Sequence, residues 1–176
     1  MNSSLVAMLL ALPATIACGQ VAFSQPTPTT PSPAQDLLIK SEVETALSML
    51  QTISSKHQKG ELTLEQAKQL GAELLRGLRY GKDGYFWADT TEGVNVVLYG
   101  RKDVEGKSRL ELKDFKGKSL TKDLIAKAKA GGGYEDYWFN KENQTTPLPK
   151  RGYVQMFEPF GWVVGTGYYL STDEKQ

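Results

Sequence analysis

The sequence has very few of the residues that build metal centres and nucleophilic active sites. Among its 176 residues there is one cysteine, Cys18, and one histidine, His57. These counts exclude an intrachain disulfide, a zinc site made of cysteine and histidine, and a haem attachment motif. A serine–histidine triad would have to use His57, which lies in a polar helical stretch far from any nucleophile elbow. We therefore expect no metal centre, no cofactor and no enzymatic activity.

The chain also lacks an excess of charge of either sign. It has 21 lysine and arginine residues against 20 aspartate and glutamate residues, which gives a net charge of +1. A protein that neutralises phosphates needs a basic surface, so we expect no nucleic-acid partner. The length suits one domain with its own hydrophobic core.

No apolar run is long enough to span a bilayer comfortably, which takes about 20 residues. The run from Leu5 to Ala17 is shorter and is interrupted by Pro13, although no lysine or arginine precedes it. It suits the core of an export signal, and residues 1–24 are predicted to be a signal peptide or a lipoprotein signal. In the second alternative Cys18 is lipidated. We expect a periplasmic or secreted protein, anchored to a membrane if Cys18 carries lipid.

The segment 25–35 consists mainly of proline, threonine and serine. Such a composition buries little apolar surface and favours an extended polyproline conformation. It predicts a linker, followed by a single folded domain over residues 36–172 and a short tail over residues 173–176.

Two amphipathic helices are predicted at the start of this domain. From Asp36 to about His57, apolar residues recur at helical spacing with polar residues on the opposite face. A second helix begins at Thr63, which forms a capping-box pattern with Gln66, and ends near Tyr80. We interpret both apolar stripes as core packing. The alternative is that the helix over residues 36–57 pairs with a second copy and forms a homodimer.

After Gly84 the sequence becomes rich in aromatic and β-branched residues, which favours strands. A loop is expected over residues 100–118, then a short helix over residues 119–130. Strands are predicted over residues 85–88, 94–99, 134–140, 152–158 and 162–171. Short strands joined by hairpins, with helices gathered beside them, indicate an α+β domain with a central antiparallel sheet of about five strands.

Five motifs occur in order along this domain, namely Arg79–Trp87, Asp103–Lys107, Gly132–Tyr134, Pro149–Val154 and Phe157–Tyr169. Taken together, they resemble the single Cache domains found outside bacterial chemoreceptors. The resemblance extends from residue 36 to residue 170. It implies a PAS-like antiparallel sheet fronted by a long helix, and extracytoplasmic sensing of small organic molecules, often short carboxylates, in chemotaxis and signal transduction.

A small carboxylate needs charge-assisted hydrogen bonds inside a pocket whose walls exclude water. Tyr85 and Trp87 share one face of their predicted strand because side chains alternate along it. The resemblance implies that Tyr99, Lys150 and Tyr153 line the pocket, so these five residues are the candidate site. Each of them also suits a structural role, the aromatic residues in the core and Lys150 at the surface.

Two features depart from the typical family pattern. Many relatives end the second strand with histidine and proline, where this chain has Tyr99 and Gly100. The chain also stops at Gln176, without a membrane helix or signalling domain. We therefore expect a soluble or lipid-anchored accessory that works with a membrane receptor or kinase. The alternative is a ligand-free interaction module with a vestigial pocket.

Overall fold

The computed structural model describes residues 30–99, 101–142 and 144–170. The predicted signal over residues 1–24, Cys18 and the tail over residues 173–176 lie outside the described residues. Within the described part, no helix has both the length and the hydropathy needed to cross a bilayer.

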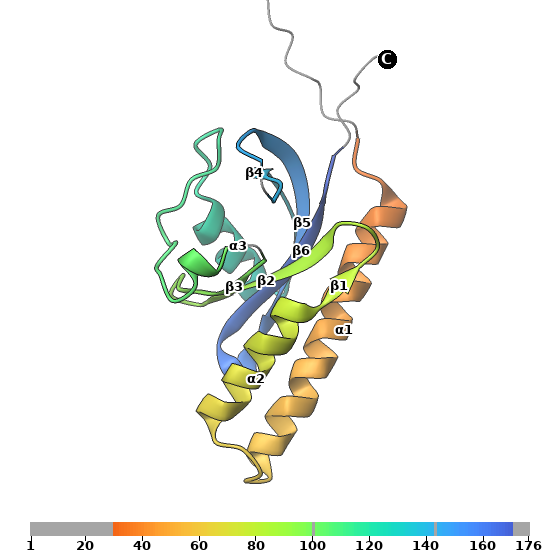
Figure 1. Cartoon of the computed structure of the whole chain (residues 1–176). Coiled ribbons are helices and arrows are strands. Elements are labelled where there is room, and N and C mark those ends of the chain that lie inside the picture. Colours follow the sequence, from red (N-terminus) through yellow and green to blue (C-terminus); the bar gives the residue numbers. More distant parts are fainter. Residues whose placement is uncertain (1–29, 100, 143, 171–176) are drawn as a thin grey trace, which may run out of the picture.

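The domain consists of three α-helices and an antiparallel sheet (Figure 1), so the predicted α+β class is confirmed. The strand order is β1-β2-β6-β5-β4, with β3 paired to β2. The sheet has six strands, because the two-residue strand β1 follows the second helix directly. The elements are α1 (Pro33–Gln58), α2 (Leu64–Gly77), β1 (Arg79–Tyr80), β2 (Gly84–Thr90), β3 (Asn95–Leu98), α3 (Leu120–Lys129), β4 (Gly133–Asn140), β5 (Pro147–Phe157) and β6 (Trp162–Tyr169).

Helix α1 begins at Pro33, inside the segment predicted to be an extended linker. Proline suits a first helical turn because its missing N–H would have no partner there. The backbone N–H of Ser32 donates to the hydroxyl of Tyr168 at 3.1 Å, and this long-range contact fixes the start of the helix. The composition indicated an extended chain, but it could not show a contact with a residue so far along the sequence.

Helix α2 starts with the predicted capping box. The hydroxyl of Thr63 accepts a hydrogen bond from the backbone N–H of Gln66, and the Gln66 side chain accepts one from the backbone N–H of Thr63. The helix ends at Gly77, earlier than predicted, because the chain turns extended at Leu78 and enters β1.

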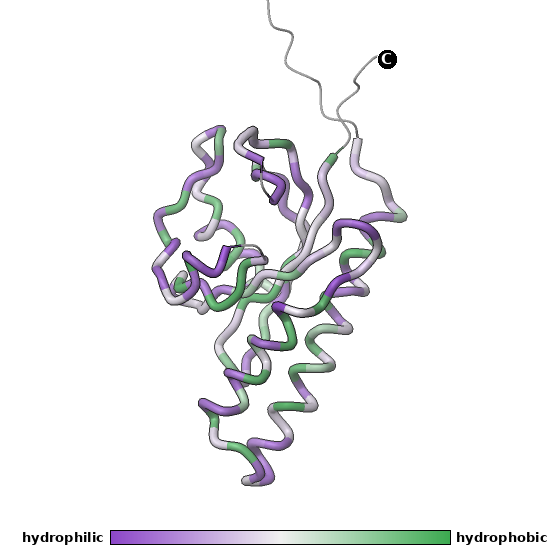
Figure 2. The backbone as a smooth tube through the Cα atoms, in the orientation of Figure 1, coloured by the Kyte–Doolittle hydropathy of each residue, from purple (hydrophilic) through white to green (hydrophobic). Residues whose placement is uncertain are grey.

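The sheet separates two hydrophobic clusters, with α1 and α2 on one face and α3 on the other (Figure 1). Apolar and polar residues alternate along α1 and α2, as the hydropathy colours of Figure 2 show. Side chains alternate along each strand, so Phe86 and Ala88 of β2 pack with the first pair of helices. Tyr85 and Trp87 pack with α3. The prediction that Tyr85 and Trp87 share a face is confirmed.

A glycine on β6 makes room for one of these aromatic rings. A Cβ atom at Gly165 would lie 2.5 Å from the Cζ2 atom of Trp87, so the absent side chain lets the indole rest against the sheet. Trp162, on the same strand, is buried in the cluster on the opposite face, with Phe160.

Candidate ligand-binding site

A buried lysine stands at the centre of the face that α3 covers. Lys150 projects from β5 and is 1% exposed. Its Nζ donates a hydrogen bond of 2.6 Å to the hydroxyl of Tyr85. Four aromatic rings surround the ammonium group, with centroids 4.1 Å (Tyr85), 4.9 Å (Tyr169), 5.2 Å (Trp87) and 5.7 Å (Phe139) from Nζ. Ring faces attract a cation and compensate part of its lost hydration.

No carboxylate among the described residues forms an ion pair with Lys150. Burial therefore lowers the pKa of Lys150, and the interaction with Tyr85 opposes this shift only in part. A buried ammonium group without a counter-ion is costly, because its hydration is lost and no protein charge replaces it. The site thus presents an uncompensated positive charge.

The charge of Lys150 also affects the pKa of the Tyr85 hydroxyl. Burial alone would raise the pKa of its hydroxyl, but the positive charge of Lys150, together with hydrogen bonding to Lys150 and Tyr169, outweighs burial. The pKa of Tyr85 consequently lies below its ordinary value. The two groups form a polarised pair inside an otherwise apolar wall.

A second cation approaches from the segment between β3 and α3. Arg109 follows Ser108, which makes an isolated β-bridge with Val94, and its backbone N–H donates to Gly93 O at 2.7 Å. The Arg109 side chain is mostly buried and its Nη1 lies 4.0 Å from Oδ1 of Asp89. The loop is thereby tied to the turn after β2, and it brings a guanidinium group to the site.

These side chains enclose a small inner cavity of about 20 Å³. Such a volume holds about one water molecule. Two cations and one carboxylate border it, so its charge favours an anion. The lining residues are Tyr85, Trp87, Asp89, Leu98, Arg109, Leu120, Thr121, Leu124, Tyr137, Phe139 and Lys150.

A wide outer groove of about 980 Å³ adjoins the inner cavity. Five residues border both spaces, namely Tyr85, Leu98, Arg109, Leu120 and Phe139. In the groove, Tyr99 stacks on Tyr85 with ring centroids 5.6 Å apart. The guanidinium of Arg79 lies over the ring of Tyr99, 3.7 Å from its centroid. The groove gives small molecules a route from the surface toward Arg109.

Four of the five predicted site residues come together here. Tyr85, Trp87 and Lys150 line the inner cavity, and Tyr99 lines the groove beside it. Tyr153 does not join them. It projects from the opposite face of β5 and packs with Ile39 and Val43 of α1.

Arg109, Asp89 and Tyr169 are site residues that were absent from the sequence prediction. Arg109 lies in the segment predicted only as a loop, and Asp89 lies just beyond the strand predicted over residues 85–88. Tyr169 belongs to the motif Phe157–Tyr169 of the sequence analysis, and it is the Cα partner of Lys150 in the β5–β6 register. That pairing could have been found by extending the hairpin back from the turn between β5 and β6.

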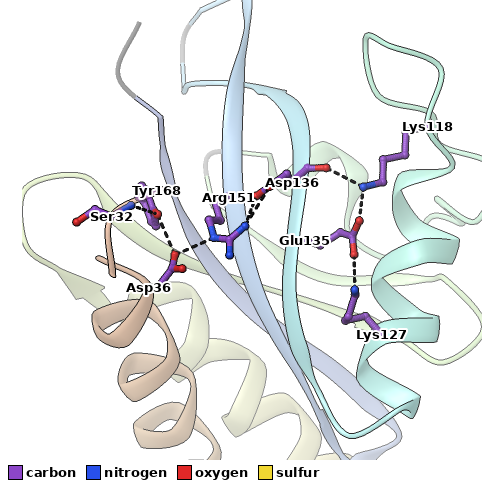
Figure 3. A network of polar contacts seen from close by, with 8 residues as sticks. All are labelled: Ser32, Asp36, Lys118, Lys127, Glu135, Asp136, Arg151 and Tyr168. Atoms are coloured by element: carbon purple, nitrogen blue, oxygen red, sulfur yellow. Dashed lines mark hydrogen bonds and ion pairs between the residues drawn. The ribbon is translucent and has the colours of Figure 1, made fainter. Parts of the chain in front are cut away.

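Arg151, on the opposite face of β5, belongs to a network of paired charges that continues through Asp136 to Lys118, Glu135 and Lys127 of α3 (Figure 3). Arg151 donates to Asp36 at 2.8 Å and to Asp136 at 2.8 Å and 3.0 Å. The Tyr168 hydroxyl also donates to Asp36, at 2.9 Å, and burial raises the pKa of Tyr168 to about 12. This network ties the first turn of α1 to β4, β5 and β6, close to where the described chain begins and ends (Figure 1).

Residues 34–175 match the family described as Single Cache domain 2. Over 125 residues the chain is 40% identical to the sensor histidine kinase MctS of Rhizobium johnstonii, covering 71% of this chain and 26% of that protein. It is 27% identical over 129 residues to the methyl-accepting chemotaxis protein McpP of Pseudomonas putida, covering 73% of this chain and 24% of that protein. The chain thus spans about a quarter of the length of these relatives.

Two solved structures share the fold at 29% sequence identity and a TM-score of 0.76. One is the periplasmic sensor domain of a chemotaxis protein, of which 96% is covered by 78% of this chain. The other is a Cache chemosensory domain solved to explain carboxylic acid recognition, of which 95% is covered, again by 78% of this chain. A chemotaxis protein of Vibrio parahaemolyticus is also similar, with a TM-score of 0.69 and 26% identity over 77% of this chain and 88% of that one.

Proposed function

The chain belongs to the single Cache domain 2 family, and from this premise we propose that it is an extracytoplasmic sensory domain that binds a short organic acid at the inner cavity. The observation that carries the proposal is Lys150, a fully buried lysine beside a cavity and without an ion-paired carboxylate among the described residues. Tyr85, Trp87 and Tyr99 form the aromatic wall, and Arg109 joins Lys150 as the second cation.

A carboxylate ligand would supply the negative counter-charge that Lys150 lacks among the described residues. Its oxygens accept charge-assisted hydrogen bonds from Lys150 and Arg109, and these bonds are strong in a site that excludes water. Because the aromatic rings are rigid, little conformational entropy is lost when the acid enters. The inner cavity has room for about one water-sized group, so the carboxylate would enter it while the carbon chain extends into the adjoining groove.

The relatives support the proposed binding of an organic acid and also suggest where the protein acts. One structural neighbour is a Cache domain studied for carboxylic acid recognition, and another is a periplasmic sensor domain. We propose a periplasmic or secreted location, consistent with the signal predicted over residues 1–24, and a receptor or kinase partner that reads the occupancy of the site. Lipidation of Cys18 would add a membrane anchor.

A ligand-free interaction module is the second candidate. One observation favours it, since the inner cavity holds no more than about one water molecule. In this case α1 would mediate homodimerisation, and its exposed Leu37 and Leu38 would contribute apolar surface.

Thermal unfolding of the purified chain with acetate, propionate, pyruvate and lactate distinguishes the two candidates. An acid at 100 times its dissociation constant adds about 2.7 kcal/mol of stability, so a binding acid raises the midpoint clearly. Lys150→Met should abolish this rise, whereas Lys59→Met, at an exposed site after α1, should preserve it. A folded, cooperative protein that responds to none of the acids would support the interaction module.

A further inference from the structure

Asp89 places a buried carboxylate beside the two cations of the inner cavity. It projects from β2 on the same face as Tyr85 and Trp87, is 3% exposed and lines the cavity. A site that held nothing but a simple carboxylate would gain no advantage from a second negative charge at this distance, because like charges repel strongly where water is excluded. The position of Asp89 therefore points to an additional feature of the ligand.

The contacts of Asp89 leave one of its oxygens open. Asn95 Nδ2 donates to Oδ1 at 2.8 Å, and Arg109 Nη1 lies 4.0 Å from the same oxygen. No residue that the structure describes donates a hydrogen bond to Oδ2. The carboxylate thus keeps an acceptor while lining a cavity large enough for a small polar group.

Asn95 holds this carboxylate in place. Its Nδ2 also donates to the carbonyl oxygens of Ala88 and Val97, each at 3.3 Å, and Asn95 itself is 1% exposed. Because the amide is fixed by the backbone of β2 and β3, Asp89 cannot turn away from the cavity without breaking buried hydrogen bonds. The open acceptor is consequently preorganised.

A ligand can satisfy both sides of the cavity if it carries a hydrogen-bond donor next to its own carboxylate. The acid group then meets Lys150 and Arg109, while the donor lies between the two carboxylates and screens their repulsion. Burial raises the pKa of Asp89, against the effects of Arg109 and Asn95, and a donor on the ligand favours the ionised form.

We propose, on the basis of the function proposed above, that Asp89 determines ligand specificity by accepting a hydrogen bond from a hydroxyl or ammonium group on the second carbon of the bound acid. The site then prefers 2-hydroxy or 2-amino acids to unsubstituted acids and to 2-oxo acids of the same length. Unsubstituted acids leave Oδ2 of Asp89 without a partner, and 2-oxo acids face it with a second acceptor.

Four acids of three carbons test this proposal by isothermal titration of the full chain: lactate, alanine, propionate and pyruvate. Lactate or alanine should bind about tenfold more tightly than propionate and pyruvate, or better, as expected for a hydrogen bond to a buried charge. Which of the two binds more tightly identifies the donor as hydroxyl or ammonium. In Asp89→Asn the preference over propionate should fall below about threefold.

Asp83→Asn, at an exposed turn position before β2, is the matched control and should keep the preference. Equal affinities for lactate, alanine and propionate in the unmodified chain would overturn the role of Asp89 and leave acid binding intact. Binding of none of the four acids would overturn both proposals. The comparison among ligands on the unmodified chain is decisive even if Asp89→Asn fails to fold.

Discussion

Lys150 and Arg151 are neighbours on one strand, but they lie on opposite faces of the sheet and differ in whether a carboxylate neutralises their charge. Arg151 makes hydrogen-bonded ion pairs with Asp36 and Asp136, in a network that extends to Tyr168 (Figure 3). Lys150 is more deeply buried and has a tyrosine hydroxyl and four rings around it, but no ion-paired carboxylate among the described residues.

The difference separates a charge that holds structural elements together from one that, in the proposed function, is left for a ligand. On the α1 face Arg151 is neutralised by Asp36 and Asp136, and its pair with Asp36 holds the first turn of α1 against β5. On the α3 face Lys150 has no ion-paired carboxylate among the described residues. Unsatisfied buried charge reduces stability, so its presence beside a cavity supports the proposal that Lys150 binds an anion.

The strongest test of this contrast exchanges each cation for methionine. Lys150→Met should weaken acid binding by about 100-fold or more, because a buried charge pair with the ligand is lost. Its free energy of unfolding should stay within about 1 kcal/mol of the unmodified value, or exceed it, because an uncompensated buried cation is removed.

Arg151→Met should show the reverse pattern. Loss of its hydrogen bonds to Asp36 and Asp136 should lower the free energy of unfolding by about 2 kcal/mol, while acid affinity changes by less than about threefold. Urea unfolding and calorimetric titration measure both quantities. Equal effects of the two variants on both quantities would contradict the separation of roles.

Gly165 tests whether the site face depends on close packing of its aromatic wall. In Gly165→Ala the new Cβ would meet Trp87 at 2.5 Å and Val154 at 2.8 Å, so the free energy of unfolding should fall by about 1–3 kcal/mol. Gly77→Ala is the control, since nothing lies within 4 Å of its Cβ. It should be neutral or stabilising by up to about 1 kcal/mol, because alanine favours the helical end of α2. An unchanged stability of Gly165→Ala would show that Trp87 does not need this space.

The pH dependence of acid binding should reflect the lowered pKa values of Lys150 and Tyr85. As the pH rises, either Lys150 loses its proton and becomes neutral, or Tyr85 loses its proton and the resulting anion neutralises the charge of Lys150. Both changes weaken acid binding, by up to about tenfold per pH unit.

The stability of the acid-free chain should change in the opposite direction. At pH values between the lowered pKa of the folded state and the ordinary pKa of the unfolded chain, each group binds fewer protons when folded than when unfolded. Its contribution to stability therefore rises with pH in this range. Titrations from about pH 7 to about pH 10 measure both effects, and the residual affinity of Lys150→Met should vary less. An affinity independent of pH in the unmodified chain would speak against a role for Lys150.

Tyr153 provides the smallest expected effect. Its ring contacts Ile39 and Val43 on the α1 face, so Tyr153→Phe should change acid affinity by less than about twofold, whereas Tyr85→Phe should weaken it by about tenfold through the lost hydroxyl. Titration with acetate compares the two variants. A large loss of affinity in Tyr153→Phe would show that the ligand lies on the other face of β5.

Local patterns were sufficient to predict much of the fold. The apolar stripes of α1 and α2, the capping box at Thr63 and the alternation of Tyr85 and Trp87 all depend on residues close in sequence. The strand β5 begins at Pro147, earlier than the start predicted at residue 152, and it includes two prolines. They are tolerated at the start of the strand, where Pro147 and Pro149 pair only with β4.

The site was harder to predict because it is assembled across the sheet. Tyr153 lies on the opposite face from Lys150 because three positions separate them on β5, and the predicted strand, which began at residue 152, did not include Lys150. Arg109 reaches the cavity only because its loop is tied to the turn after β2. The contact of the Arg109 loop leaves no mark in the local sequence, whereas the aromatic motifs that surround Lys150 do.

A crystal structure of the chain grown with acetate tests the central claim most directly. The proposal predicts a carboxylate in the inner cavity, accepting hydrogen bonds from Lys150 Nζ and the Arg109 guanidinium, with Tyr85 and Trp87 against it. An acetate bound elsewhere, with only water beside Lys150 at saturating acid, would contradict it.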